Sequence, residues 1–250
     1  MNPPENIKMK KTCKVENRDN LVNDIYKMTF DAGESGFSGP GQYAMIEARG
    51  RRKPYQVCEY DSNRFTIVFE ADDDISRDLS ELKIGDEVIV DGGLGTGFAA
   101  DELPDEVCIV ANGMGIPEML GVARTLLVRG KKCKTILEYP SKKDIYMLDS
   151  FKNLVNEIEV VTVDGSNGRE GKAEDVVKKR DYVLASGTLD MLKKVAEKVE
   201  NGQFSLSSTV LAHSADYDDC YLETTEGRKN CSDDGPVFDK NIIIWESLAV

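Results

Sequence analysis

Short apolar runs separated by turn residues dominate the first hundred residues. They lie at 10–17, 24–30, 42–47, 64–70 and 87–91, with glycine, proline, asparagine and aspartate between them. Short runs at this spacing predict the strands of a small antiparallel barrel. One short helix is expected from residue 76 to residue 85, where Leu79 and Leu82 recur at helical spacing before a glycine.

The pattern changes after residue 105. Apolar runs at 107–111, 135–139, 158–163, 182–186 and 205–211 alternate with helical periodicity at 117–129, 173–179 and 189–200. Pro117 stands in the first turn of the first of these helices and Gly130 follows its end, which suits both residue types. Alternating strands and helices predict a parallel sheet covered by helices.

The two patterns divide the chain into parts. We expect a β-barrel domain at residues 1–100, an α/β nucleotide-binding-type domain at 101–211 and a C-terminal tail at 212–250. Pro104 and three acidic residues between 97 and 105 mark the boundary. The tail is polar and predicted as loop, with a return to strand at 241–245. The expected fold class is a six-stranded-type antiparallel barrel followed by a Rossmann-like parallel sheet.

Charge and composition narrow the class of partner. The 250 residues carry a net charge of −13, which disfavours nucleic acid and anionic membranes as partners. There is no apolar run of about 18 residues that would span a membrane, and residues 1–14 have no apolar core of a secretory signal. The six cysteines are scattered, so we expect reduced thiols and a cytoplasmic location.

Turns at the predicted carboxyl ends of the parallel strands are candidate binding sites. Gly113, Gly115 and Pro117 stand between a strand and a helix, where backbone N–H groups and the positive helix end meet a phosphate. Gly187 follows the strand at 182–186, and residues 164–166 follow another. Open α/β sheets bind ligands along this edge, which favours a nucleotide site over plain turns, the alternative interpretation.

An ordered set of segments along nearly the whole chain resembles one family. The segments are residues 40–45, 52–56, 79–86, 92–98, 112–117, 139–144, 164–166, 187–192 and 231–238. They resemble the dihydroorotate dehydrogenase electron-transfer subunit family, within the ferredoxin reductase superfamily. The resemblance implies FAD on the barrel, NAD(H) on the α/β domain and a [2Fe–2S] cluster in the tail. It also implies a redox partner, a dihydroorotate dehydrogenase-like catalytic subunit or another redox protein.

Two flavin-binding motifs of the family are altered. The first, Arg-Pro-x-Ser, corresponds to Lys53, Pro54, Tyr55 and Gln56. Lysine keeps the charge without the bidentate fork of arginine, and glutamine still donates a hydrogen bond. Tyr55 is expected either on the flavin ring or in the barrel core.

The second flavin motif places glycine and threonine at a helix start to hold the diphosphate. Residues 72–77 match it, with Ser76 as a helix cap but with three consecutive aspartates and Ile75 in place of a glycine. The carboxylates either repel a diphosphate or simply stabilise the helix start.

Glu138 ends the second predicted parallel strand. An acid there accepts a ribose hydroxyl and disfavours a 2′-phosphate, which favours NAD over NADP.

The cluster-binding segment is incomplete. The plant-type pattern needs C-x₄-C-x₂-C and one distant cysteine. Cys220 matches the third position and Cys231 the fourth, whereas Ala212 and Tyr217 occupy the first two. The sequence therefore predicts loss of the [2Fe–2S] cluster, leaving two thiols or, alternatively, a disulfide or weak metal site. The single histidine, His213, is expected at the surface.

Three functions are compatible with these residues. The first is an electron-transfer subunit that uses NAD(H) and FAD, which is the function we expect. The second is a non-catalytic binding or regulatory relative that kept the fold and lost its cofactors. The third is a cluster-free flavin reductase.

Overall fold

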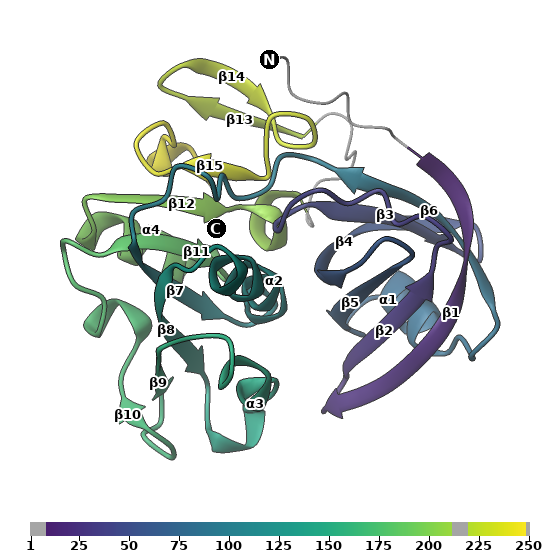
Figure 1. The fold of residues 1–250 in the computed structure, drawn as a ribbon, viewed down its shortest axis with the longest axis horizontal. Coiled ribbons are helices and arrows are strands. Elements are labelled where there is room, and N and C mark those ends of the chain that lie inside the picture. Colours follow the sequence, from purple (N-terminus) through teal and green to yellow (C-terminus); the bar gives the residue numbers. More distant parts are fainter. Residues whose placement is uncertain (1–8, 212–219, 249–250) are drawn as a thin grey trace.

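The computed structural model describes residues 9–211 and 220–248. Its first part is a closed barrel in which every strand pairs antiparallel, with the strand order β1-β2-β5-β4-β3-β6 (Figure 1). The six-stranded barrel expected from the sequence is thereby confirmed. Its elements are β1 (Met9–Val22), β2 (Ile25–Asp31), β3 (Tyr43–Ala48), β4 (Arg51–Tyr60), β5 (Arg64–Glu70), α1 (Asp74–Ser80) and β6 (Glu87–Leu94).

The barrel interior is filled by side chains that alternate along the strands. Phe30 and Phe65, from the paired strands β2 and β5, stack with ring centroids 5.0 Å apart. Alternate residues of a strand point to the same face, so the period-two runs of the sequence direct these side chains inward. The large, fully buried side chains of this core include Met28, Phe30, Ile46, Phe65, Ile67 and Leu79.

The second part is a sheet with the strand order β10-β9-β8-β7-β11-β12-β15. All of its pairings are parallel except that between β12 and β15. The predicted Rossmann-like sheet is confirmed, with an antiparallel edge strand added by the tail. Its elements are β7 (Glu106–Asn112), α2 (Gly115–Val128), β8 (Lys132–Tyr139), α3 (Leu148–Phe151), β9 (Glu157–Thr162), β10 (Arg169–Glu170), β11 (Tyr182–Ser186), α4 (Leu189–Lys198), β12 (Asn201–Ser205) and β15 (Val237–Asp239).

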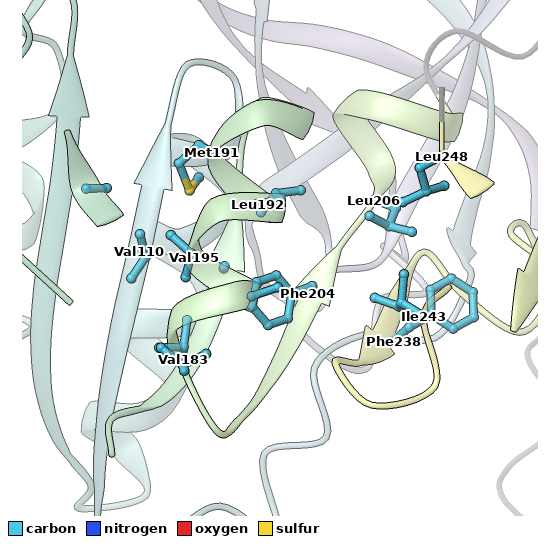
Figure 2. Close-up of a cluster of buried hydrophobic side chains, with 14 of the residues drawn as sticks. Val110, Val183, Met191, Leu192, Val195, Phe204, Leu206, Phe238, Ile243 and Leu248 are labelled. Atoms are coloured by element: carbon cyan, nitrogen blue, oxygen red, sulfur yellow. The ribbon is translucent and has the colours of Figure 1, made fainter. Parts of the chain in front are cut away.

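Helices α2 and α4 belong to different hydrophobic clusters of the sheet. Met191, Leu192 and Val195 of α4 pack on β7, β11 and β12, and Ile243 and Leu248 of the C-terminal segment join the same cluster (Figure 2). Helix α2 lies between the sheet and β4 of the barrel (Figure 1). A Cβ on Gly121 of α2 would lie 2.6 Å from the Cys58 carbonyl oxygen of β4, so glycine permits this close approach.

The remaining segments are short. A hairpin of β13 (Tyr221–Thr224) and β14 (Gly227–Asn230) stands apart from both larger sheets. Single helical turns cover Lys142–Asp144, Ala173–Asp175 and Trp245–Ser247, and a π-helical turn covers Ser207–Leu211. Among the described residues, no helix combines the length and apolar character needed to cross a membrane.

The sequence analysis missed one barrel strand, β4. Its first residues, Arg51 and Arg52, are charged, and Pro54 lacks the N–H that an interior strand uses. The structure accommodates Pro54 because β4 pairs with β5 only from Val57 onward, so that Pro54 lies where β3 is its paired neighbour. The strand is therefore compatible with a proline that a continuous ladder would exclude.

Other expectations were also wrong. The short helix expected at residues 76–85 is Asp74–Ser80, and the tail expected as loop contains β13, β14 and β15, which pair with each other or with β12. The helix predicted at residues 173–179 is a single turn, Ala173–Asp175. The last parallel strand is Asn201–Ser205 rather than residues 205–211, because Gly202 lies against Val183 of β11 and the chain turns after Ser205. Residues 241–245 form no strand in the described structure and contribute one bridge, between Ile243 and Thr224.

Candidate functional site

A cavity of about 500 Å³ lies between the barrel and the parallel sheet. Strand β7 pairs with β8 on one side and β11 on the other, so the chain order reverses between β7 and β11. Open α/β sheets bind ligands at such a reversal. The barrel lines the cavity with β3, β4, β5 and the start of α1, and the sheet lines it with the turns after β7, β11 and β12. The lining residues are Tyr43, Lys53, Pro54, Tyr55, Gln56, Val68, Phe69, Glu70, Asp72, Asp73, Ser76, Gly113, Met114, Gly187, Thr188, Ser207 and Ser208.

The structure brings most of the predicted cofactor-binding residues together at this cavity. Those that line it are Lys53, Pro54, Tyr55, Gln56, Ser76, Gly113 and Gly187. Gly115 and Pro117 are buried in the first turn of α2, behind the wall. The roles of all these predicted residues toward a cofactor stay predictions. The lining also contains Tyr43, Phe69, Thr188 and Ser207, which the sequence analysis did not single out as binding residues.

On the barrel wall, Lys53 is already paired with a carboxylate. Its Nζ lies 2.7 Å from Oδ2 of Asp73, while Oδ1 of Asp73 accepts the Ser76 N–H at 2.7 Å. Asp73 is thus the cap of α1, and the expectation that Ser76 caps this helix was wrong because the helix begins at Asp74. Burial raises the pKa of Asp73, but the bonds from Lys53 and Ser76 outweigh it and hold that pKa below its usual value. The Asp73 carboxylate therefore takes both the Lys53 ammonium group and the Ser76 N–H at the start of α1.

Tyr55 and Ser76 connect this ion pair to the barrel core. The Tyr55 side chain is buried, its ring meets Phe69 edge-on at 5.5 Å, and its hydroxyl lies 3.3 Å from Ser76 Oγ. Tyr55 thus belongs to the barrel core and also lines the cavity. The barrel-core environment expected for Tyr55 is confirmed, and contact with a flavin ring stays a prediction.

Gln56 contacts a buried carboxyl group that the sequence analysis missed. Glu118, in the first turn of α2, is fully buried, and its Oε2 accepts hydrogen bonds from Gln56 Nε2 at 2.9 Å and Ser186 Oγ at 2.5 Å. Oε1 accepts from Ser205 Oγ at 2.9 Å, and Ser207 Oγ lies 3.4 Å from Oε2. Burial raises the pKa of Glu118 to about 7, although the serine hydrogen bonds act to lower it.

Backbone atoms of two glycine turns shape the cavity wall that the parallel sheet contributes. Gly113 has φ +48° and Gly187 has φ +155°, and a Cβ on Gly187 would lie 2.1 Å from Asn112 Oδ1. The Asn112 side chain joins the two turns, because its Oδ1 accepts the Thr188 N–H at 2.8 Å. Tyr146 fixes the first turn by donating its hydroxyl to the Gly113 carbonyl at 2.7 Å.

Glu138 is buried at the end of β8 and is bonded within the chain. Its Oε1 accepts from Asn112 Nδ2 at 3.0 Å and its Oε2 accepts the Ala173 N–H at 2.7 Å. Glu138 thereby joins the end of β7 to the turn at Ala173–Asp175. Its expected role toward a ribose hydroxyl, and the preference for NAD over NADP, stay predictions.

The two cysteines of the predicted tail site lie side by side. The Cys231 N–H donates to the Cys220 carbonyl at 2.7 Å, and both side chains are buried. The hydrogen bond with the Cys220 thiol, together with burial, raises the pKa of Cys231 above its usual value. Among the described residues, no cluster of three or more His, Cys, Asp or Glu could hold a metal. Ala212, His213 and Tyr217 lie outside the described residues.

The tail also contacts the cavity wall. Tyr43, which lines the cavity, donates its hydroxyl to the Ser232 carbonyl at 3.4 Å, one residue after Cys231. The Thr96 hydroxyl donates to the Asp234 carbonyl at 2.8 Å. The tail is thereby anchored to the barrel on the side where β3 and β6 approach the sheet.

Comparison with known proteins agrees with this architecture. No protein-family model matches the chain. It is 31% identical over 215 residues to "Dihydroorotate dehydrogenase B (NAD(+)), electron transfer subunit" of Fusobacterium nucleatum, covering 78% of this chain and 83% of the relative. The protein of the same name from Clostridium perfringens is 28% identical over 233 residues, covering 90% and 94%.

Solved structures show the same fold. The NADH-dependent reduced ferredoxin-NADP oxidoreductase structure matches with a TM-score of 0.81 and 24% identity, covering 94% of this chain and 91% of that one. Phthalate dioxygenase reductase matches with a TM-score of 0.63 and 19% identity, covering 75% of this chain and 63% of that one. The family expected from the sequence is confirmed by the relatives: the chain belongs to the family of dihydroorotate dehydrogenase B electron transfer subunits.

Proposed function

We propose that the protein is the electron-transfer subunit of an oxidoreductase. It moves electrons between NAD(H), a flavin in the cavity and a partner protein, which is a dihydroorotate dehydrogenase-like catalytic subunit or another redox protein. The name shared by the relatives supports this assignment. The observation that carries it is the cavity itself, because strand β4 and the turns after β7 and β11 face one space. A ring held on β4 and a nucleotide held on those turns would meet there.

The nucleotide half of the site fits a dinucleotide phosphate. Helix α2 has 14 residues, and among the described residues no side chain caps its N-terminus at Met114. Pro117 has no N–H and the Ile116 N–H donates to the Gly113 carbonyl at 3.1 Å, so it is mainly the positive end of the helix dipole that favours a phosphate here. Gly113 gives the ligand close access to the backbone at this turn, because it carries no Cβ and its φ is +48°. We assign NAD(H) to this turn.

The barrel half fits a flavin ring but not the FAD diphosphate. Tyr43, Tyr55 and Phe69 offer aromatic surface, and the Gln56 amide lies at the edge of the cavity. A flavin bound there supplies hydride acceptance and electron transfer. At the diphosphate position, however, the Asp73 carboxylate holds both Lys53 and the Ser76 N–H. The residues present thus fit the ring part of FAD and conflict with its phosphates.

The proposed electron path contains no cluster. Cys220 and Cys231 supply two thiols, whereas a [2Fe–2S] cluster needs four ligands. We therefore place electron exit at the cavity, where the partner protein would approach the flavin.

Anaerobic titration with NADH tests the proposal. The full chain is incubated with flavin, freed of excess and titrated with NADH while flavin absorbance is followed. Bleaching with one equivalent of NADH per bound flavin is the expected result, and the same protein without flavin is the control. A protein that binds flavin but leaves it oxidised under excess NADH and NADPH would contradict the proposal.

A non-catalytic binding or regulatory role is the second candidate function. It is favoured by the way polar groups of the barrel wall satisfy one another, in the pairs Lys53–Asp73 and Gln56–Glu118. Groups already paired in this way need no cofactor for their stability. This candidate predicts a colourless protein that takes up no flavin at all, so the same titration separates the two functions.

A further inference from the structure

We infer that the cavity takes a flavin without phosphate, an uncharged isoalloxazine ring with its polyol chain, and disfavours FMN and FAD. This inference rests on the proposed function and names the chemical class of its flavin. It starts from the disagreement between the residues present and the dinucleotide that the resemblance implies.

The charges around the cavity oppose an anionic ligand. Of the described side chains that line it, Lys53 is the one cation, while Glu70, Asp72 and Asp73 are carboxylates, giving a formal sum of 1 − 3 = −2. A phosphate monoester carries between one and two negative charges at neutral pH. Asp72 and Asp73 are 62% and 43% exposed, so water and salt reduce this repulsion, but its sign still opposes each added phosphate.

The one cation is not available to offset that repulsion. Lys53 Nζ lies 2.7 Å from Asp73 Oδ2 and 4.0 Å from Asp72 Oδ1, and its side chain is 16% exposed. A ligand phosphate would have to displace a charge-assisted bond of this length, the stronger class of hydrogen bond. It would also compete with Asp73 Oδ1 for the Ser76 N–H. The wall thus contains its own anion at the position that a phosphate would need.

The same wall suits an uncharged ligand. Tyr43, Tyr55 and Phe69 line the cavity with the exposed edges of largely buried rings, and the carboxylates can accept hydrogen bonds from the hydroxyls of a polyol chain. Ser207 and Ser208 add hydroxyl groups on the opposite side. The volume of about 500 Å³ lies within the usual range for small-molecule pockets. An uncharged ring and polyol chain therefore meet these groups without placing charge against charge.

Parallel binding measurements test the inference. Riboflavin, FMN and FAD are titrated separately into the full chain at one ionic strength, and dissociation constants are taken from flavin fluorescence and calorimetry. We expect riboflavin to bind at least about tenfold more tightly than FMN or FAD, an energy difference of about 1.4 kcal/mol. The readout is binding and does not depend on turnover.

Asp73→Asn tests the cause of the selectivity. Asparagine is as good a helix cap as aspartate, so the variant removes the charge and keeps α1. We expect FMN and FAD to bind about tenfold more tightly than to wild type and riboflavin to change by less than about twofold. Adding Lys53→Met to this variant should abolish the gain, since Lys53 would be the freed partner of the phosphate.

Asp74→Asn is the matched control. It makes the same change of charge at the next residue, but Asp74 is 75% exposed and is not among the described residues that line the cavity. Its selectivity should equal that of wild type.

The possible outcomes separate this inference from the proposed function. Tighter binding of FAD than riboflavin by wild type overturns the inference and leaves the proposed function standing. Riboflavin that binds selectively but is not reduced by NADH or NADPH overturns the proposed function alone. Failure of all three flavins to bind wild type and Asp73→Asn overturns both. The wild-type order of affinities decides the inference even where a variant fails to fold.

Discussion

The two walls of the cavity are built in different ways. On the sheet side, close packing of backbone at Gly115 and Gly187 sets the shape, and a side chain at either position would collide with neighbouring atoms. On the barrel side, side chains set the chemistry, and Lys53, Asp73 and Gln56 are bonded to other residues of the chain. A wall made by backbone needs only a few glycines to persist. The ligand preference of a wall made by side chains changes when a few residues are substituted.

The sheet wall is set by the glycine turns after β7 and β11. The barrel wall instead holds an internal anion, Asp73, beside its cation, Lys53. Substitutions at the two walls should therefore change the free energy of unfolding by very different amounts.

The largest effect is expected from Gly115→Ala, directly behind the sheet wall. The new Cβ would lie 2.1 Å from the Ser186 carbonyl oxygen and 2.5 Å from the Gly187 nitrogen, both backbone atoms that cannot rotate away. We expect a loss of about 3 kcal/mol or more in the free energy of unfolding, measured by urea denaturation. Gly113→Ala is the control, because no described atom lies within 4 Å of its Cβ and only its φ of +48° costs about 1 kcal/mol. Equal losses in the two variants would show that contact does not set this wall.

The next effect concerns Glu118, which joins the two walls through Gln56. Its pKa is about 7 in the folded protein against an ordinary 4.5, so the folded state holds the proton more tightly than the unfolded state. The stability from the neutral carboxyl is present below about pH 4.5 and is lost as the pH rises to about 7, a change of about 3 kcal/mol.

Glu118→Gln removes this pH dependence. The variant should match wild type near pH 4.5 and exceed it by about 3 kcal/mol in unfolding free energy at pH 8, measured by urea denaturation at both pH values. Glu197→Gln, on an exposed position of α4, is the control and should follow wild type at both pH values. A wild-type advantage at pH 8 would mean that the three serines and Gln56 stabilise the carboxylate more than burial destabilises it.

The sequence predicted the local features of the fold well. Strands β5 and β11 were predicted with their observed bounds, because their apolar runs are short, unbroken and flanked by turn residues. Strand β4 was not predicted, because the proline and the arginines in its sequence are untypical of a strand. Only its pairing with β3 and β5 shows that they are tolerated. The start of β12 was not predicted either, because Gly202 is untypical of a strand. Its close contact with Val183 of β11 becomes known only once the two strands are paired.

The chemistry of the site was less predictable because it depends on residues far apart in the chain. Glu118 resembles an ordinary helix residue, and its burial follows from Ser186, Ser205 and Ser207, which three other segments supply. An acid inside the apolar stretch at 115–123 was the one signal available. Glu138 was placed correctly at the end of a strand, but Asn112 and Ala173 engage its oxygens. Which partners satisfy a carboxylate is a property of the folded chain.

A smaller effect is expected from Asp73→Ala on the barrel wall. The substitution removes both the cap of α1 and the partner of Lys53. We expect a loss of about 1 kcal/mol in unfolding free energy, whereas Asp73→Asn should lose only a few tenths because asparagine also caps helices. Thermal and urea denaturation of both variants measure the difference. If Asn and Ala cost the same, the ion pair with Lys53 rather than the cap dominates.

The smallest effect is expected one residue further on, at Asp74. Its carboxylate lies 3.1 Å from Arg77 and 3.6 Å from Arg51, but its side chain is 75% exposed and water screens both pairs. Exposed ion pairs contribute little, so Asp74→Asn should change the unfolding free energy by no more than about 0.5 kcal/mol. The small change should shrink further in high salt, since surface pairs are screened. A loss as large as that of Asp73→Ala would mean that the acidic run stabilises α1 as a whole. The barrel wall would then be set by summed charge, and not by the one carboxylate that holds Lys53.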